Sequence, residues 1–206
     1  METRHAPLQA FLDALGDAYF ARTRDAAAIV SLHKIFADLE SVEHPALATG
    51  RRLPICGVLD DLKPSSQAKD EHDLQHVMTR FLALEPTLVW QRRQGDWTGA
   101  SENFGENHAN TIIVGPGGLE QRTDVWLGVS LLAPHVLYPD HRHTPEETYL
   151  VMTQGGFRQG RNPWVDVTRG ETFYNPHNIL HSMRSGDHPL LVFWALREKS
   201  EADALV

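Results

Sequence analysis

The segment HVLYPDHRHTPEETY, residues 135–149, contains a close group of side chains that can ligate a metal ion. His141 and His143 are two residues apart, so in an extended strand both imidazoles point to the same face. Pro145 favours a turn after His143, and a following strand that starts near Glu147 brings this carboxylate back to the same point. The segment therefore predicts that three side chains converge on one ion.

A second segment, GETFYNPHNILH at residues 170–181, supplies a fourth ligand. Gly170 and Pro176 mark turns at the two ends of a short strand, and His181 lies at the head of the next strand. An HxHxxxE string alone arises by chance, but together with this second segment it indicates a real site. The predicted metal ligands are His141, His143, Glu147 and His181.

Three neutral imidazoles and one carboxylate leave coordination positions open for water or substrate, as in catalytic rather than structural metal sites. One divalent transition metal is therefore the expected cofactor, and zinc, iron, manganese, cobalt and nickel all suit this ligand set. Glu146 is the nearest alternative to Glu147 as the carboxylate ligand, but the spacing favours Glu147. His177 occupies a turn position and is expected to be exposed.

The part of the chain after Pro86 has the pattern of short β-strands, because runs of β-branched and aromatic residues alternate with turn residues. The expected strands span residues 87–91, 111–114, 125–132, 148–153, 164–167 and 190–196, and residues 95–110 are expected to form a long loop. Many short strands at close spacing predict a jelly roll or barrel in which alternate side chains face inward.

The first part of the chain is predicted to be helical. Apolar residues recur at helical spacing over residues 6–22, again over residues 29–39, and a third time over residues 74–84. The chain is therefore divided into an N-terminal helical extension, residues 1–86, and a β-barrel domain that carries the metal site, residues 87–206.

Composition excludes several classes of partner. The net charge of -8 and the pI of about 5.8 leave no basic stripe for nucleic acid. No apolar run approaches the roughly 20 residues of a membrane span, and the N-terminal residues lack a signal-peptide pattern. We therefore expect a cytoplasmic protein without a membrane segment. The single cysteine, Cys56, excludes an intramolecular disulfide and a multi-cysteine zinc site.

The two segments resemble the two cupin motifs, HxHxxxE and GxxxxxPxxxxH. This resemblance implies a mainly β fold, a double-stranded β-helix or jelly-roll barrel, here preceded by the α-helical extension. All four ligand positions are intact. The departures are peripheral: His135 and Asn178 stand where the motifs usually have glycine, and Ser185 stands where asparagine is usual. Asparagine can adopt the left-handed conformation that glycine supplies, so the turn at Asn178 is expected to survive.

Two tyrosines accompany the ligands. Tyr149 follows Glu147 by two residues and shares its strand face, whereas Tyr138 precedes His141 by three and faces inward only if the two intervening residues break the alternation. The resulting pattern, YxxHxHxxxExY with a distal histidine, resembles the bacterial dimethylsulfoniopropionate (DMSP) lyases of the cupin superfamily. The likeness extends across the β half of the chain.

This resemblance implies a carbon–sulfur lyase that cleaves DMSP by β-elimination to dimethyl sulfide and acrylate. The metal is implied to bind the substrate carboxylate and to stabilise the charge that develops next to it. Tyr149, as a phenolate, is the implied general base, and Tyr138 is implied either to bind near the metal or to orient the substrate. The partner is then a small zwitterion, and the protein is expected to be a monomer or a homodimer.

A sulfonium cation cannot donate conventional hydrogen bonds, so aromatic faces are expected to hold it. Trp194, in the terminal run LLVFWAL, alternates in a sense that can face the barrel interior and is the predicted substrate-binding aromatic residue. Trp126 and Trp164 are explained at least as well as residues of the core or rim.

Two other functions remain open at this point. A cupin dioxygenase that uses iron and O2 would suit the same four ligands. A non-catalytic, metal-dependent binding module for a small molecule would need the metal but not the two tyrosines. The tyrosines therefore favour an enzyme.

Overall fold

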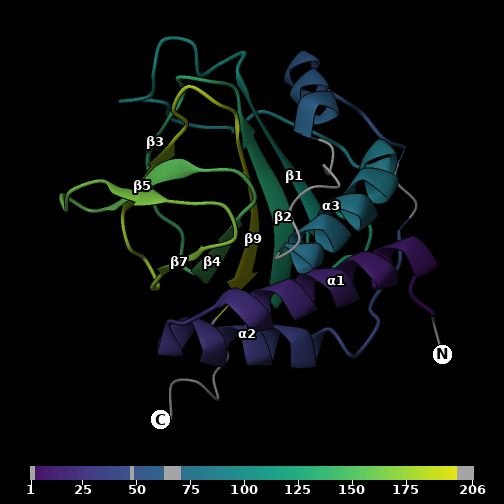
Figure 1. The fold of residues 1–206 in the computed structure, drawn as a ribbon. Coiled ribbons are helices and arrows are strands. Elements are labelled where there is room, and N and C mark those ends of the chain that lie inside the picture. The colour runs from purple at the N-terminus through teal and green to yellow at the C-terminus, as the bar shows by residue number, and fades with distance from the viewer. Residues whose placement is uncertain (1–2, 47–48, 63–70, 199–206) are drawn as a thin grey trace.

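The computed structural model describes residues 3–46, 49–62 and 71–198, and its β-strands form two antiparallel sheets (Figure 1). One sheet runs in the order β1 (His108–Val114), β2 (Val125–Leu132), β9 (Leu190–Arg197), β4 (Glu146–Val151) and β7 (Thr172–Asn175). The other runs in the order β3 (Leu137–His141), β8 (His181–Arg184), β5 (Gly155–Gln159) and β6 (Val165–Val167). The predicted fold class, mainly β with N-terminal helices and with strands arranged in two antiparallel sheets as in a jelly roll, is confirmed.

The described helices all precede the strands in the chain. They are α1 (Ala6–Arg22), α2 (Ala26–Asp38) and α3 (His72–Leu84), with two 3-10 segments, η1 (Pro54–Leu62) and η2 (Glu85–Thr87). Asp25 caps α2, because its carboxylate accepts a hydrogen bond from the backbone N–H of Ala28 at 2.9 Å. The three predicted helices are confirmed to within a few residues at their ends. The segment η1 was not predicted. No helix in the described ranges is both long and apolar enough to cross a membrane.

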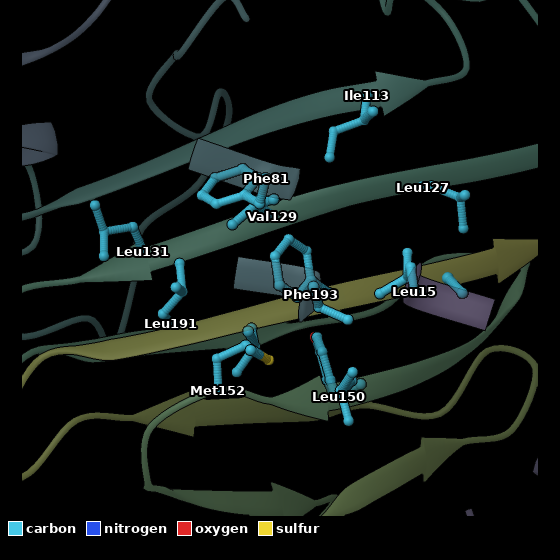
Figure 2. Close-up of a cluster of buried hydrophobic side chains, with 14 of the residues drawn as sticks. Leu15, Phe81, Ile113, Leu127, Val129, Leu131, Leu150, Met152, Leu191 and Phe193 are labelled. Carbon is cyan, nitrogen blue, oxygen red and sulfur yellow. The ribbon is translucent and has the colours of Figure 1, made fainter. Parts of the chain in front are cut away.

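The helices cover one face of the five-stranded sheet (Figure 1). The ring of Phe193 in β9 packs against Phe11 of α1 and Phe81 of α3, with centroids 5.5 and 5.1 Å apart. Figure 2 shows this cluster, in which Leu15 of α1 and Phe81 lie among apolar side chains of β2, β4 and β9. The other face of the sheet is thereby left for the interior of the barrel.

Of the six strands predicted from β-branched and aromatic runs, five correspond to β1, β2, β4, β6 and β9. The sixth, residues 87–91, was wrong, since only isolated bridges join Val89 to Arg51 and Gln91 to Asn110. The short strand predicted between Gly170 and Pro176 is β7, and the strand predicted to begin at His181 is β8. The predicted loop at residues 95–110 is shorter than expected because β1 already begins at His108. The segment 87–91 has no continuous partner strand, so its extended backbone does not become part of a sheet.

Candidate metal centre

The four predicted ligands come from four neighbouring segments of the barrel. His141 is the last residue of β3, Glu147 lies in β4 and His181 is the first residue of β8. His143 lies in the connection between β3 and β4, so the expectation that His141 and His143 share one extended strand was wrong. The turn still brings the two rings together, with centroids 6.1 Å apart.

The three histidine rings are oriented by the same kind of hydrogen bond. Each Nδ1 lies against a backbone carbonyl: His141 with Pro139 at 3.0 Å, His143 with Pro145 at 2.8 Å and His181 with Ile179 at 3.0 Å. A carbonyl only accepts hydrogen bonds, so Nδ1 carries the proton and Nε2 keeps its lone pair. One nitrogen from each ring lies within 4.8 Å of the others. This tautomer and this spacing suit imidazoles that ligate a metal ion.

The carboxylate of Glu147 lies beside two of these histidines. Its Oε2 atom lies 3.4 Å from Nε2 of His143 and 3.2 Å from Nε2 of His181. Both nitrogens are buried, and neither has a hydrogen-bond partner among the described residues. Two lone pairs that face a carboxylate oxygen in a buried place repel unless a cation or proton lies between them. The three histidine nitrogens therefore form a group that can hold a metal ion, and the Glu147 carboxylate lies beside two of them.

Burial and neighbouring charges shift the pKa values of this group. Burial would raise the pKa of Glu147, but the imidazoles of His143 and His181 lower it overall, so the carboxylate is ionised. Burial, reinforced by His181, lowers the pKa of His141 to about 3 and keeps this ring neutral. Burial also lowers the pKa of His143, but the Glu147 carboxylate outweighs it and the net shift is upward. The ionised Glu147 carboxylate and the neutral His141 imidazole are therefore in the forms that bind a cation.

Asn175, at the end of β7, supports the carboxylate and was missed in the sequence. Its Nδ2 donates to Oε2 of Glu147 at 3.2 Å, and its Oδ1 accepts a hydrogen bond from Nε2 of Gln159 at 2.9 Å. Asn175 is fully buried. Its place directly before Pro176 of the second segment was the available signal.

The ligand group opens into a cavity of about 320 Å³ with walls from both sheets. The lining residues are Gln91, Arg92, Arg93, Gln94, Asn110, Ile112, Trp126, Ser130, Tyr138, His141, His143, Glu147, Tyr149, Met183, Trp194 and Leu196. Both predicted tyrosines and the predicted tryptophan are among them. Pockets of this size and mixed lining are suited to a small organic ligand.

The two tyrosines are buried in the cavity wall beside the histidines. The Tyr149 ring lies 6.3 Å from the ring of His181, and the Tyr138 ring lies 4.9 Å from that of His141, between centroids. The inward position of Tyr138 agrees with its prediction, because the pairing of β3 with β8 shifts register between Tyr138 and His141. Burial raises the pKa of Tyr149, and the carboxylate of Glu147 raises it further.

Tyr138 has a different environment from Tyr149. Its hydroxyl accepts a hydrogen bond from Nδ2 of Asn110 at 3.1 Å. Burial raises the pKa of Tyr138, while the guanidinium of Arg93 opposes that rise. Asn110 and Arg93 were not singled out in the sequence. Asn110 lies at the end of the predicted loop, and nothing in the local pattern marks Arg93.

Trp194 lies on the cavity side of β9. Its Nε1 donates to Oγ of Ser130 at 3.2 Å, and its ring lies over Gly128 of β2, where a Cβ atom would be 2.2 Å away. Trp126 lines the same cavity. The aromatic wall of the cavity therefore comes from two neighbouring strands, β2 and β9.

The remaining candidate residues lie outside the ligand group. Oε2 of Glu146 accepts a hydrogen bond from the hydroxyl of Tyr174 at 2.6 Å. His177 is half-buried rather than exposed, because its Nδ1 is hydrogen-bonded to the carbonyl of Thr144 at 2.8 Å. The guanidinium groups of Arg158 and Arg184 lie over the Trp164 ring, 4.7 and 4.4 Å from its centroid, and Trp164 is not among the residues that line the cavity.

The departures from the cupin motifs keep the local backbone that the motifs require. Asn178 has φ of 57° and His135 has φ of 59°, so both adopt the left-handed conformation in place of glycine. Ser185 joins two turns, because its Oγ accepts from the N–H of Val136 at 2.9 Å and donates to the carbonyl of Ala133 at 2.6 Å.

Comparison with known proteins relates the chain to DMSP lyases. No curated protein sequence matches the chain. A chain from the crystal structures of the DMSP lyases RdDddP and RnDddQII superposes with a TM-score of 0.72 at 22% identity, covering 96% of this chain and 95% of that chain. The DMSP lyase DddQ from Ruegeria pomeroyi DSS-3 superposes with a TM-score of 0.69 at 20% identity, covering 94% and 93%. The family model for DMSP lyase matches residues 27–192. The chain therefore belongs to the DMSP lyase family.

Proposed function

We propose that this protein is a metal-dependent carbon–sulfur lyase that cleaves DMSP by β-elimination to dimethyl sulfide and acrylate. Membership of the DMSP lyase family supports the choice of substrate. The main support for the proposal is the arrangement of the site. His141, His143 and His181 lie close enough together to hold a metal ion, and Glu147 lies beside them. The adjoining cavity is also lined by Tyr138, Tyr149 and Trp194.

The ligand group and Tyr149 divide the chemical work. His141, His143, Glu147 and His181 would hold a divalent metal ion, which would supply a Lewis acid for the substrate carboxylate. Tyr149, as a phenolate, removes a proton from the carbon next to that carboxylate. The electron pair of the broken C–H bond forms the double bond of acrylate. The C–S bond breaks with its pair on sulfur, neutral dimethyl sulfide leaves, and the proton stays on the Tyr149 oxygen.

The position of Tyr149 is suited to this role. It lies two residues after Glu147 on the same face of β4, so its hydroxyl is held beside the ligand group. Burial and the Glu147 carboxylate raise its pKa, so formation of the phenolate requires positive charge nearby. Tyr149 is therefore expected to act as the base only when the site holds a metal ion.

The aromatic wall is proposed to hold the other end of the substrate. The face of Trp194 is fixed by its hydrogen bond to Ser130 and offers a surface for a dimethylsulfonium group. Tyr138, fixed by Asn110, is proposed to orient the substrate next to the ligand group. The substrate carboxylate is then held at the metal site, and the sulfonium is held by the aromatic face of Trp194.

The experiment supplies purified, metal-loaded protein with DMSP and measures dimethyl sulfide in the headspace and acrylate in solution. We expect equal amounts of the two products. Tyr149→Phe should lower kcat by at least about 100-fold, the usual contribution of a general base, without loss of bound metal. His143→Ala should lose the metal and the activity together.

Release that persists in Tyr149→Phe would reject this residue as the base but would leave the lyase activity in place. Absence of dimethyl sulfide from the loaded wild-type protein would reject the lyase proposal. Oxygen uptake by the iron form with a thiol or catechol would then identify a dioxygenase.

A further inference from the structure

The cavity has an excess of positive charge at one end. Arg92 and Arg93 line it. Glu147 is the one carboxylate among the described lining residues, and its Oε2 atom already contacts the Nε2 atoms of His143 and His181. Arg92 forms an ion pair with Glu106. No carboxylate of the described residues lies within ion-pair distance of Arg93, so its charge has no protein counter-ion there.

The backbone of Arg93 is held firmly next to the cavity. Its N–H donates to Nε2 of His108 at 2.8 Å, and its carbonyl accepts a hydrogen bond from the indole N–H of Trp97 at 3.1 Å. His108 is itself buried and stacked on Phe104, with centroids 3.6 Å apart. The arginine therefore projects from a fixed point.

The guanidinium of Arg93 lies close to the proposed reaction site. Its Cζ atom is 5.6 Å from the centroid of the Tyr138 ring, and that ring contacts the ring of His141. The Nε atom of Arg93 is buried and has no hydrogen-bond partner among the described residues. A buried guanidinium nitrogen without a partner is costly unless a ligand supplies an acceptor.

We propose that Arg93 binds the substrate carboxylate and selects substrates that carry one; this inference rests on the proposed function for the identity of the substrate. A guanidinium matches the geometry of a carboxylate, whose second oxygen stays available to the ligand group. The same charge repels the sulfonium and directs it toward Trp194. Arg93 is thus a substrate-binding residue that fixes which end of the zwitterion enters first.

The first test compares Arg93→Gln and Arg93→Lys on two substrates, DMSP and its propionamide analogue, which keeps the sulfonium but has no carboxylate charge. For DMSP, Arg93→Gln should raise KM about 10- to 100-fold, and Arg93→Lys should recover part of that loss. For the propionamide, KM should change less than about twofold, since no charge-assisted hydrogen bond is lost. The ratio of kcat/KM for the two substrates should fall accordingly.

The matched control is Arg158→Gln. Arg158 is also half-buried in the barrel, with an unpartnered Nε, but it pairs with Asp140 and does not line the cavity. The control removes the same charge and should leave the KM for DMSP near its wild-type value. Thermal unfolding of all variants checks that each is folded.

A second test needs neither metal nor turnover. Binding of acrylate to protein freed of metal by a chelator is measured by calorimetry for the wild type, Arg93→Gln and Arg158→Gln. Acrylate should bind the wild type and Arg158→Gln and should bind Arg93→Gln at least about tenfold more weakly. If acrylate binding depends on Arg93 but DMSP gives no dimethyl sulfide, the carboxylate site stands and the proposed function fails. If dimethyl sulfide is released while Arg93→Gln keeps the wild-type KM and acrylate affinity, this inference is overturned and the function stands.

Discussion

At the scale of single residues, the position of the Glu147 carboxylate depends on Asn175. This buried amide donates to Glu147 and is held in turn by Gln159. Asn175→Ala removes the donor and should weaken metal binding by about 10- to 100-fold, the usual effect of losing a partner of a metal ligand. Asn175→Asp, which keeps the size but cannot donate when ionised and adds a negative charge, should disturb the orientation of Glu147 at least as much.

Metal affinity is measured by competition with a chromophoric chelator, and thermal unfolding reports whether the variants are folded. A folded Asn175→Ala protein with wild-type affinity would show that Glu147 does not need this support.

The residues that sequence reasoning identified and missed differ in kind. The predicted ligands His141, His143, Glu147 and His181 lie in two short segments, where spacing along the chain already suggests convergence. Arg93 and Asn110 act through partners far away in sequence, Asn110 by its hydrogen bond to Tyr138. Their roles arise from pairing between strands, which a local pattern does not contain.

At the scale of elements, the register between β2 and β9 determines where Trp194 lies. Trp194 pairs with Gly128, and a Cβ at that glycine would lie 2.2 Å from the indole and 2.4 Å from the carbonyl oxygen of Thr111. Gly128→Ala should therefore destabilise the fold by about 1–3 kcal/mol and displace the indole. The substrate KM should rise because the predicted sulfonium surface moves.

Urea unfolding and tryptophan fluorescence measure the two effects. Gly57→Ala is the control, because nothing lies within 4 Å of a Cβ at that position. Wild-type stability and an unchanged spectrum in Gly128→Ala would mean that Trp194 is not confined by this contact.

The elements also show where sequence patterns are sufficient. β2 was predicted with its observed ends, because its apolar run faces the helical layer on one side and the cavity on the other. β5 escaped prediction because Gly155 and Gly156 have low β propensity, and this strand is fixed instead by its pairing with β8 and β6. The strand prediction for residues 87–91 was wrong for the opposite reason. These residues have high β propensity, but no neighbouring strand pairs with them continuously.

At the scale of the whole molecule, the helical part and the barrel share one apolar core. Phe11 and Phe81 pack on Phe193, and the hydroxyl of Tyr19 donates to the carbonyl of Thr148 at 2.9 Å. The division of the chain at residue 86 stays a prediction. The shared core implies that the two parts depend on each other for folding.

A fragment of residues 87–206 tests that dependence. Without the helices, one face of the five-stranded sheet would expose apolar side chains, each worth about 1.5–3 kcal/mol when buried. The side chains concerned are Leu127, Val129, Leu131, Leu150, Leu191 and Phe193. We expect the fragment to aggregate or to lack near-ultraviolet circular dichroism and metal binding. The Tyr19→Phe variant of the 206-residue chain, which loses the hydroxyl that donates to the carbonyls of Thr148 and Phe193 at the same interface, should stay folded and lose only about 1 kcal/mol. A soluble fragment that unfolds cooperatively and binds one metal ion would show instead that the helices are dispensable, because a site assembled from β3, β4 and β8 would then be stabilised by the barrel alone.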